Sequence, residues 1–350
     1  MKLFEKTLRE IRPIDPAWIA AARARQFELT KPTGSLGRLE EVANRCAAIR
    51  ESFALTASRP RIVIFAADHG VSLEGVSPYP REVTAQMVVN YLHGGAAINA
   101  LARSGGIELK VVDVGVATAM PPSSELISRR VASGTRNFCQ EPAMTEAEMI
   151  AALETGIELA TDAASAGCDL LGFGEMGIGN TTSASAIAAA LTHQPPEAVV
   201  GRGSGADEAG LARKRAVVQR ALALHSGSLG NPLDILRCVG GLEVAAMCGF
   251  CLGAAARRMP FVVDGFISTS AAALAVQLSP ASSGYLFASH RSVEPGHGGL
   301  LAILGDEPLL DLGMRLGEGT GAALAMKLIQ AAIAAFTGMA TFLSAGVSNK

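Results

Sequence analysis

Aromatic and charged side chains are both scarce in this chain. Of its 350 residues only 5% are aromatic and 18% are charged, whereas 49% are hydrophobic and 38 are glycines. This composition predicts a compact globular protein with ample material for a core. Because few rings are available to fill space, we expect helices and sheet to pack closely through small residues.

A surplus of positive charge is also missing. The formal net charge is −2 at neutral pH. Nucleic acid and anionic membrane surfaces attract proteins through clustered lysine and arginine, so neither is expected as a partner.

The cysteines lack the spacing of a disulfide framework, which favours a reducing compartment. Residues 1–6 also lack the apolar core of a signal peptide, so we expect a cytoplasmic protein. Cys248 and Cys251 form a C-x-x-C pair, but no second pair or histidine lies near them, and we interpret them as buried structural thiols.

Two apolar segments approach the roughly 20 residues needed to cross a bilayer, residues 239–256 and 328–347. The first contains Glu243, and the second consists mainly of alanine, glycine and threonine with Gln330 inside it. Both are therefore predicted to be buried helices, and no membrane association is expected.

Five β-runs separated by helical segments predict the fold. The runs are residues 61–70, 109–116, a short apolar run that starts at residue 168 and leads into a glycine loop, 261–269 and 285–292. Residues 117–145 look irregular, whereas helices are expected at 36–53 and 82–104. Strands that alternate with helices indicate an α/β protein with three layers, a mostly parallel Rossmann-like sheet with helices on both faces. Helical material at both chain ends is expected to form a small helical subdomain.

Polar side chains gather where the β-runs stop. In open parallel sheets, ligands bind outside the carboxyl ends of the strands, so these side chains predict one shared cleft. They are Asp68, His69, Asp113, Glu175, Asp264, His290 and Ser292.

Residues 168–185 read as strand, glycine loop and helix. Free N–H groups at a helix start attract anions, phosphate above all, and Asn180, Thr181, Thr182 and Ser183 are candidate N-caps. Residues 172–177 also match the dinucleotide fingerprint G-x-G-x-x-G, which leaves an NAD-dependent oxidoreductase as the alternative function. Glu175 lies where a pyrophosphate would bind, which favours a site for one phosphate.

Two further segments carry candidate chemistry. Glu318 stands between Gly317 and Gly319 just before a helix, where the helix start is expected to keep it ionised as a general base; an ordinary capping acid is the alternative. His290, Glu294 and His297 have the density of a metal site. However, Pro295 and Gly296 prevent one continuous helix, so a ligand-binding loop is favoured and no metal is expected.

Six segments, taken together and in order, resemble one family, the nicotinate-nucleotide–dimethylbenzimidazole phosphoribosyltransferases. They are residues 31–40, 67–70, 172–182, 263–266, 289–297 and 315–321. The resemblance implies transfer of phosphoribose from nicotinate mononucleotide to 5,6-dimethylbenzimidazole, giving α-ribazole 5′-phosphate and nicotinate with inversion at C1′, in cobalamin nucleotide-loop assembly. It also implies a homodimer without a cofactor, a large domain of residues 60–315, and a small helical domain of residues 1–59 plus 316–350.

The resemblance further assigns roles to individual residues. Glu318 corresponds to the catalytic base and Glu175 to a second active-site acid. The base pocket corresponds to Tyr79, Gln86, Met87, Met176 and Leu316. The phosphate and ribose contacts correspond to Gly174, Gly177, Gly179, Asn180, Thr181, Thr182, Gly203, Lys214, Asp264, Ser292 and Arg315.

Overall fold

The computed structural model describes residues 3–121 and 123–348 and contains one parallel sheet. The strands lie in the order β3-β2-β1-β4-β5-β6, and every neighbouring pair is parallel. Their bounds are β1 Pro60–Ala67, β2 Glu108–Gly115, β3 Leu126–Ser128, β4 Leu170–Met176, β5 Phe261–Val263 and β6 Leu286–Ala288. β1 lies in the middle of the sheet. β2 and β3 are added on one side of it and β4, β5 and β6 on the other, so the topological switch point lies between β1 and β4.

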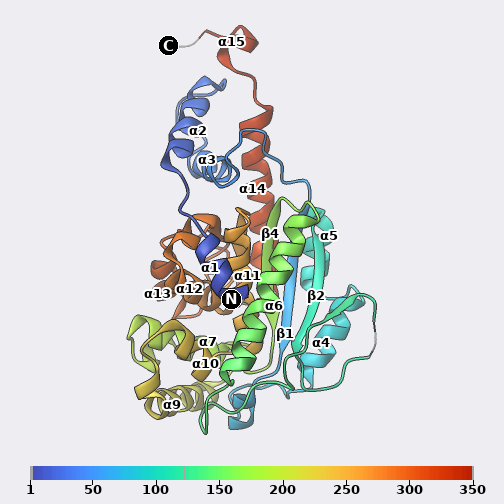
Figure 1. The fold of residues 1–350 in the computed structure, drawn as a ribbon, viewed down its shortest axis with the longest axis vertical. Helices are drawn as coiled ribbons and strands as arrows, with labels where there is room; N and C mark the ends of the chain where they lie inside the picture. The colour runs from blue at the N-terminus through green and yellow to red at the C-terminus, as the bar shows by residue number, and fades with distance from the viewer. Residues whose placement is uncertain (1–2, 122, 349–350) are drawn as a thin grey trace.

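Helices cover both faces of the sheet (Figure 1). The side chain of Phe173 on β4 points toward Phe250 of α11, whereas a Cβ at the preceding Gly172 would point toward Met326 of α14. Successive residues of a strand face opposite sides, so α11 and α14 lie on opposite faces and the predicted three-layer α/β fold is confirmed. The α-helices are α1 Leu3–Glu10, α2 Pro16–Glu28, α3 Arg38–Arg50, α4 Val83–Leu92, α5 Ala97–Gly105, α6 Glu146–Ser165, α7 Asn180–Thr192, α8 Pro196–Val199, α9 Glu208–Leu224, α10 Pro232–Val239, α11 Leu242–Ala256, α12 Phe266–Leu278, α13 His297–Leu304, α14 Thr320–Gly338 and α15 Phe342–Ala345. Three short 3₁₀ segments complete these elements: η1 Gly70–Glu74, η2 Ser226–Ser228 and η3 Pro280–Tyr285.

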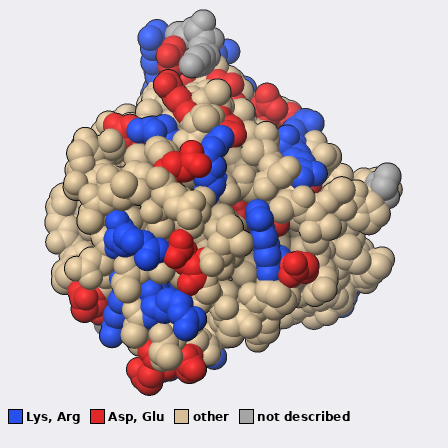
Figure 2. Space-filling view, turned by 90° about the horizontal axis from the view of Figure 1, so that it is seen from below, with Lys and Arg blue, Asp and Glu red and all other residues tan. Residues whose placement is uncertain are grey.

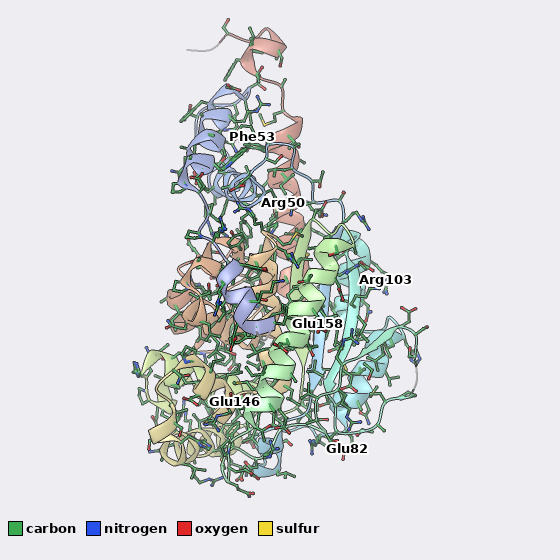
Figure 3. The ribbon with its side chains drawn as sticks, viewed as in Figure 1. Arg50, Phe53, Glu82, Arg103, Glu146 and Glu158 are labelled. Carbon is green, nitrogen blue, oxygen red and sulfur yellow. The ribbon has the colours of Figure 1, made fainter. Side chains whose placement is uncertain are left out.

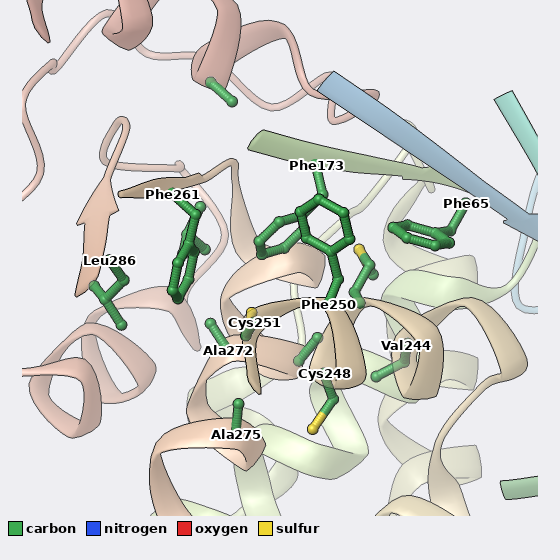
Figure 4. Packing of buried hydrophobic residues seen from close by; sticks show 14 of the residues in the cluster. Phe65, Phe173, Val244, Cys248, Phe250, Cys251, Phe261, Ala272, Ala275 and Leu286 are labelled. Carbon is green, nitrogen blue, oxygen red and sulfur yellow. The ribbon is translucent and has the colours of Figure 1, made fainter. Parts of the chain in front are cut away.

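Few aromatic rings are needed because small residues let the layers approach closely. Phe65, Phe173 and Phe250 form edge-to-face pairs with ring centroids 5.7 and 5.8 Å apart under the sheet (Figure 4). Beyond them α6 packs so tightly on α11 that a Cβ at Gly156 would lie 1.8 Å from the carbonyl oxygen of Ala246. Cys248 and Cys251 are buried in this layer, and burial raises the pKa of both thiols, as expected for structural cysteines.

Helices α2 and α3 pack together, and α3 also packs on α14, beyond one end of the sheet (Figure 1). Phe53, labelled in Figure 3, packs edge to face on Trp18 of α2 and on Phe336 of α14. Helix α1, in contrast, packs on α6 and α11 of the sheet-bearing part. The division into domains of residues 60–315 and 1–59 plus 316–350 stays a prediction.

Several predicted element boundaries were wrong, each for a local reason. The helix expected at 82–104 is two helices, because Gly94 has φ +75° and ends α4. The helix expected from residue 36 begins at Arg38, since Gly37 precedes it with φ +55°. Residues 266–269 open α12 instead of extending β5, and β3 lies inside the segment that was expected to be irregular.

Helix α14 is apolar and long enough to cross a membrane by length and composition alone. Half of that apolar window is buried inside the protein, and the helix packs on β1, β4 and β5. It is therefore a core helix of this fold. On the face seen in Figure 2, positive and negative side chains are interspersed among uncharged ones and do not gather into one basic patch.

Candidate active site

A cavity of about 690 Å³ opens at the carboxyl ends of β4, β5 and β6, beside the switch point between β1 and β4. Its walls come from the end of β4, the N-termini of α7 and α12, and the segments around residues 77–87, 203–204, 290–294 and 315–318. The predicted cleft at the strand ends is therefore present. Of the polar side chains expected to share it, Glu175, His290 and Ser292 line the cavity, whereas Asp68, His69, Asp113 and Asp264 do not.

Glu175 occupies the buried end of β4 and is 4% exposed. Burial raises its pKa well above the ordinary carboxyl value, and the nearby carboxylates of Glu243, Asp264 and Glu318 raise it further. The side-chain amide of Asn180 donates a hydrogen bond to Glu175. Glu175 thus holds its proton over a wider pH range than an exposed glutamate.

Glu318 has an unusual backbone conformation. Its φ is +62°, between Gly317 at +84° and Gly319 at +83°. The other described residues besides glycine with positive φ, Glu51, His193 and Arg258, all follow the ends of helices, where this conformation is common. Glu318 instead precedes a helix and lines the cavity, and a side chain held in a costly conformation at a pocket is typical of functional sites.

Asp264 and Gly174 hold Glu318 in place from below. The Asp264 carboxylate accepts hydrogen bonds from the N–H groups of Gly319, Gly321 and Ala322, at 2.7 to 3.1 Å. Gly174 lies directly beneath, and a Cβ there would be 2.1 Å from the backbone nitrogen of Gly319. Asp264 therefore caps α14, while the hydroxyl of Thr320 donates to the carbonyl of Gly317.

Burial raises the pKa of Glu318, and Asp264 raises it further, whereas the neighbouring hydroxyl of Tyr91 lowers it. Burial thus opposes the helix dipole, which was expected to keep this carboxyl ionised. The raised pKa of Glu318 lies closer to neutral pH than that of an exposed glutamate, which suits a general base.

The other side of the cavity carries a buried cation beneath a glycine turn. The ammonium of Lys214 is 3.1 Å from the hydroxyl of Thr181 and 3.1 Å from the carbonyl of Gly201. Burial lowers the pKa of Lys214. Gly203 donates its N–H to Glu294 and accepts a hydrogen bond from Arg315, so the turn is fixed on both sides.

Comparison with known proteins decides the family. A family model described as phosphoribosyltransferase matches residues 11–347. The nicotinate-nucleotide–dimethylbenzimidazole phosphoribosyltransferase of Chloroflexus aurantiacus is 53% identical over the full length of both chains, and that of Geobacter sulfurreducens is 52% identical over 100% of this chain and 99% of its own. Crystal structures of this enzyme and of CobT, both from Thermus thermophilus, match with TM-scores of 0.90 and 0.91 at 50% identity, each covering 96% of this chain and 100% of the other.

The chain belongs to the nicotinate-nucleotide–dimethylbenzimidazole phosphoribosyltransferase family. As a phosphoribosyltransferase it brings most of the predicted site residues to one cavity. Those that line the cavity are Glu175, Glu318, Gly177, Gly179, Asn180, Thr181, Gly203, Ser292, Arg315, Tyr79, Met87, Met176 and Leu316.

Five predicted site residues lie outside the lining of this phosphoribosyltransferase cavity. Gly174, Asp264 and Lys214 lie beneath it and support residues that face it. Thr182 is fully buried in α7. Gln86 is exposed on α4, because each helical residue turns about 100° from the last and the inward face belongs to Val83 and Met87.

Sequence reasoning missed one wall of the phosphoribosyltransferase site. Residues 265–268 line the cavity because α12 begins there, whereas a strand was expected through residue 269. Gly265 is the N-cap of α12, and a glycine directly after the apolar run of β5 was the one feature in the sequence that indicated a helix start there. The other cavity-lining residues that were not predicted are Ser77, Val83, Ile178, Ser204 and Gly317.

The histidines near the site do not form a metal cluster among the residues that the structure describes. Both ring nitrogens of His297 are engaged: Nδ1 accepts the N–H of Ser292 at 2.9 Å, and Nε2 lies 3.0 Å from the hydroxyl of Thr269. Burial lowers the pKa of His297 to about 3, so its ring is neutral. Glu294 is turned toward Gly203 instead.

The oxidoreductase alternative is not supported. Gly172 and Gly174 of the G-x-G-x-x-G pattern lie inside β4 instead of in a turn after it, and α7 begins only at Asn180. Both glycines make room for the N-terminal part of α14, not for a pyrophosphate. The relatives are phosphoribosyltransferases over the full chain.

Proposed function

We propose that this protein transfers the 5-phosphoribosyl group of nicotinate mononucleotide to 5,6-dimethylbenzimidazole, with Glu318 as the general base. The observation that carries this proposal is the position of Glu318: its backbone has a positive φ, its side chain lines the cavity, and the pKa of its carboxyl is raised. The family's activity, named for close relatives along the full chain, supports it. The products are α-ribazole 5′-phosphate and nicotinate.

The attacking azole needs a base because one of its nitrogens carries a proton. As the other nitrogen bonds to C1′, that proton must leave, and the ionised Glu318 carboxylate receives it. Apolar cavity residues suit a flat aromatic ring, namely Tyr79, Met87, Met176 and Leu316. Nicotinate departs from a pyridinium as a neutral ring, so its leaving requires no acid.

Positive charge develops on the ribose as the bond to nicotinate breaks. Glu175 and Glu318 bring two carboxyl groups to the cavity at the end of β4, and a carboxylate that is ionised there stabilises that charge. Attack from the face opposite the leaving group inverts C1′ from β to α. Much of the rate enhancement is expected from holding the two rings and the ribose in line.

The phosphate is proposed to bind where the α7 N-terminus meets the glycine turn at Gly203. N–H groups at the start of α7, the Thr181 hydroxyl and the guanidinium of Arg315 face this part of the cavity. Lys214 supplies a positive charge from beneath Thr181. Ser292 lies on the same wall.

We further propose that the enzyme acts in the cytoplasm as a homodimer, and that residues 60–315 and the terminal helices form separate domains. The scattered free cysteines and the small net charge support a reducing compartment.

The test is an incubation of the purified protein with nicotinate mononucleotide and dimethylbenzimidazole in the presence of a chelator, with products identified by mass. We expect a ribazole phosphate and free nicotinate. Glu318→Gln should lower kcat by roughly 10²- to 10⁴-fold and leave nicotinate mononucleotide binding nearly intact. Glu51→Gln is a matched control, since Glu51 is also a glutamate with positive φ but lies outside the cavity. Normal turnover by Glu318→Gln would remove Glu318 from the mechanism.

A further inference from the structure

Two buried side chains outside the cavity lining form a hydrogen-bonded pair behind the turn that opens α7. His69 lies between β1 and η1, Glu243 lies in the first turn of α11, and both side chains are fully buried. Nε2 of His69 is 2.5 Å from Oε1 of Glu243. An ionised carboxylate only accepts hydrogen bonds, so Nε2–H donates, and hydrogen bonds to a charged acceptor are the strong ones.

Each member of this pair depends on the other. Nδ1 of His69 and Oε2 of Glu243 are buried without a hydrogen-bond partner among the described residues. In the part of the chain that the structure describes, the bond between them is therefore the one side-chain hydrogen bond that either residue makes. Burial of two such groups is costly and a buried pair adds little net stability, so the pair is better explained by what it holds in place.

The ring of His69 is held between two glycine backbones. A Cβ at Gly177 would lie 3.3 Å from Cδ2 of the ring, and a Cβ at Gly241 would lie 2.4 Å from Cε1. Gly177 belongs to the turn after β4, whereas Gly241 is the N-cap of α11. Because the start of α11 and Glu243 fix the ring on one side, the ring supports the turn on the other.

The supported turn faces the cavity. Gly177 and Gly179 line it, and Gly179 is the N-cap of α7 with φ +101°. A Cβ at Gly179 would lie 3.3 Å from Cβ of His69, so both glycines of the turn rest on this one residue. The direction of the N–H groups at the start of α7 therefore depends on where His69 lies.

We propose that His69 and Glu243 are positioning residues that hold the turn of Gly177 and Gly179, so that the N–H groups opening α7 bind the phosphate of nicotinate mononucleotide. This inference rests on the proposed function, which assigns the phosphate to the α7 N-terminus. The pair acts through the turn and does not touch the substrate. Its effect is large because an N–H group binds an oxygen well only within a narrow range of distances and angles.

The experiment compares Glu243→Met with Glu243→Gln. Both side chains are close to glutamate in length; glutamine keeps an oxygen that accepts Nε2–H, whereas methionine leaves His69 without that bond. Binding of nicotinate mononucleotide and of nicotinate riboside, which lacks the phosphate, is measured by calorimetric titration. Binding is measured in place of kcat because, besides burial, the charge of Glu243 raises the pKa of Glu175. Circular dichroism checks that each variant is folded.

Gly241→Ala perturbs the same contact from the other side. Gly241 has φ −147°, a conformation that alanine adopts without strain. Its new Cβ would press on the ring of His69 and lie 2.7 Å from Oε2 of Glu243, without removing either side chain. This variant decides by the same criteria if Glu243→Met does not fold.

We expect Glu243→Met and Gly241→Ala to weaken binding of nicotinate mononucleotide by roughly 10- to 100-fold and to leave binding of nicotinate riboside unchanged. Glu243→Gln should bind both ligands nearly as the wild type does. Equal weakening of both ligands would overturn the proposal, and so would wild-type binding by folded Glu243→Met. Glu243→Gln as weak as Glu243→Met would show that charge and not position matters, which also refutes it. If neither Glu243→Met nor Gly241→Ala folds, the pair maintains the fold and the proposal is wrong.

The wild-type protein separates this inference from the proposed function. Absence of ribazole phosphate, with tighter binding of the mononucleotide than of the riboside, would refute the transfer reaction alone, and the variants would still test the pair. Equal binding of the two ligands by the wild type would show that the turn does not bind phosphate. That result would overturn this inference even if ribazole phosphate is formed.

Discussion

Gly174→Ala is expected to disable the enzyme without unfolding it. The new Cβ would lie 2.1 Å from the nitrogen of Gly319 and 2.3 Å from the carbonyl carbon of Glu318, where ordinary contacts begin at 3.4 Å. The backbone carrying Glu318 must therefore move by about 1.3 Å or the strand must yield. Misplacing a catalytic group by about 1 Å costs about 10²-fold in rate, so we expect kcat to fall by about that factor.

Gly172→Ala is the matched control on the same face of the same strand. Its Cβ would meet the terminal methyl of Met326 at 2.6 Å, and that flexible side chain is able to move aside. Both variants overpack the contact between β4 and α14, and each should lose about 1 to 3 kcal/mol of stability. Only Gly174→Ala displaces Glu318.

The assay measures kcat and KM for both substrates, together with the free energy of unfolding from urea titration. We expect a kcat loss confined to Gly174→Ala. Wild-type kcat in a folded Gly174→Ala protein would refute the reasoning, because Glu318 would then tolerate displacement. Equal losses of kcat in both variants would show that general strain, and not the position of Glu318, causes the effect.

Two further predictions concern stability. Because burial and neighbouring carboxylates raise the pKa of Glu175 in the folded state, its contribution to stability is present at low pH and is lost as pH rises above the unfolded value of about 4.3. Glu175→Gln should therefore melt at a higher temperature than the wild type at pH 8 and at a similar temperature near pH 4; a lower Tm at pH 8 would contradict this. Thr145→Ala removes the hydroxyl that accepts the N–H of Glu148 at the start of α6, and should cost about 1 kcal/mol in urea unfolding with kcat unchanged, since Thr145 lies outside the cavity lining.

The sequence contained enough information to predict the sheet because the long strands are continuous apolar runs. β1 and β4 are buried on both faces, so their β-branched and apolar residues read clearly as strands. β3 was missed because it has only three residues and pairs at the edge of the sheet. A segment that short has no periodicity to detect, and only its pairing with β2 defines it as a strand.

Site residues could be predicted where the neighbouring residues in the sequence indicate the local structure. Glu318 was singled out because it stands between two glycines just before a helix, and it lines the cavity. The supporting residues were harder to place, because whether Asp264 or Lys214 faces the cavity or lies beneath it depends on packing between distant segments. The open start of α12 was hidden because Phe266 and Ile267 continue the apolar run of β5.

The scarcity of large side chains and the position of the proposed base have a common physical cause. To place a carboxyl group over the end of β4, the start of α14 must lie against the strand backbone, and this is possible only where Gly174 meets Gly319. Such close approach removes water from the turn, so its N–H groups need an internal acceptor, which Asp264 provides. The same dehydration raises the pKa of Glu318. Small residues at this contact thus determine both where the carboxyl group lies and how readily it accepts a proton.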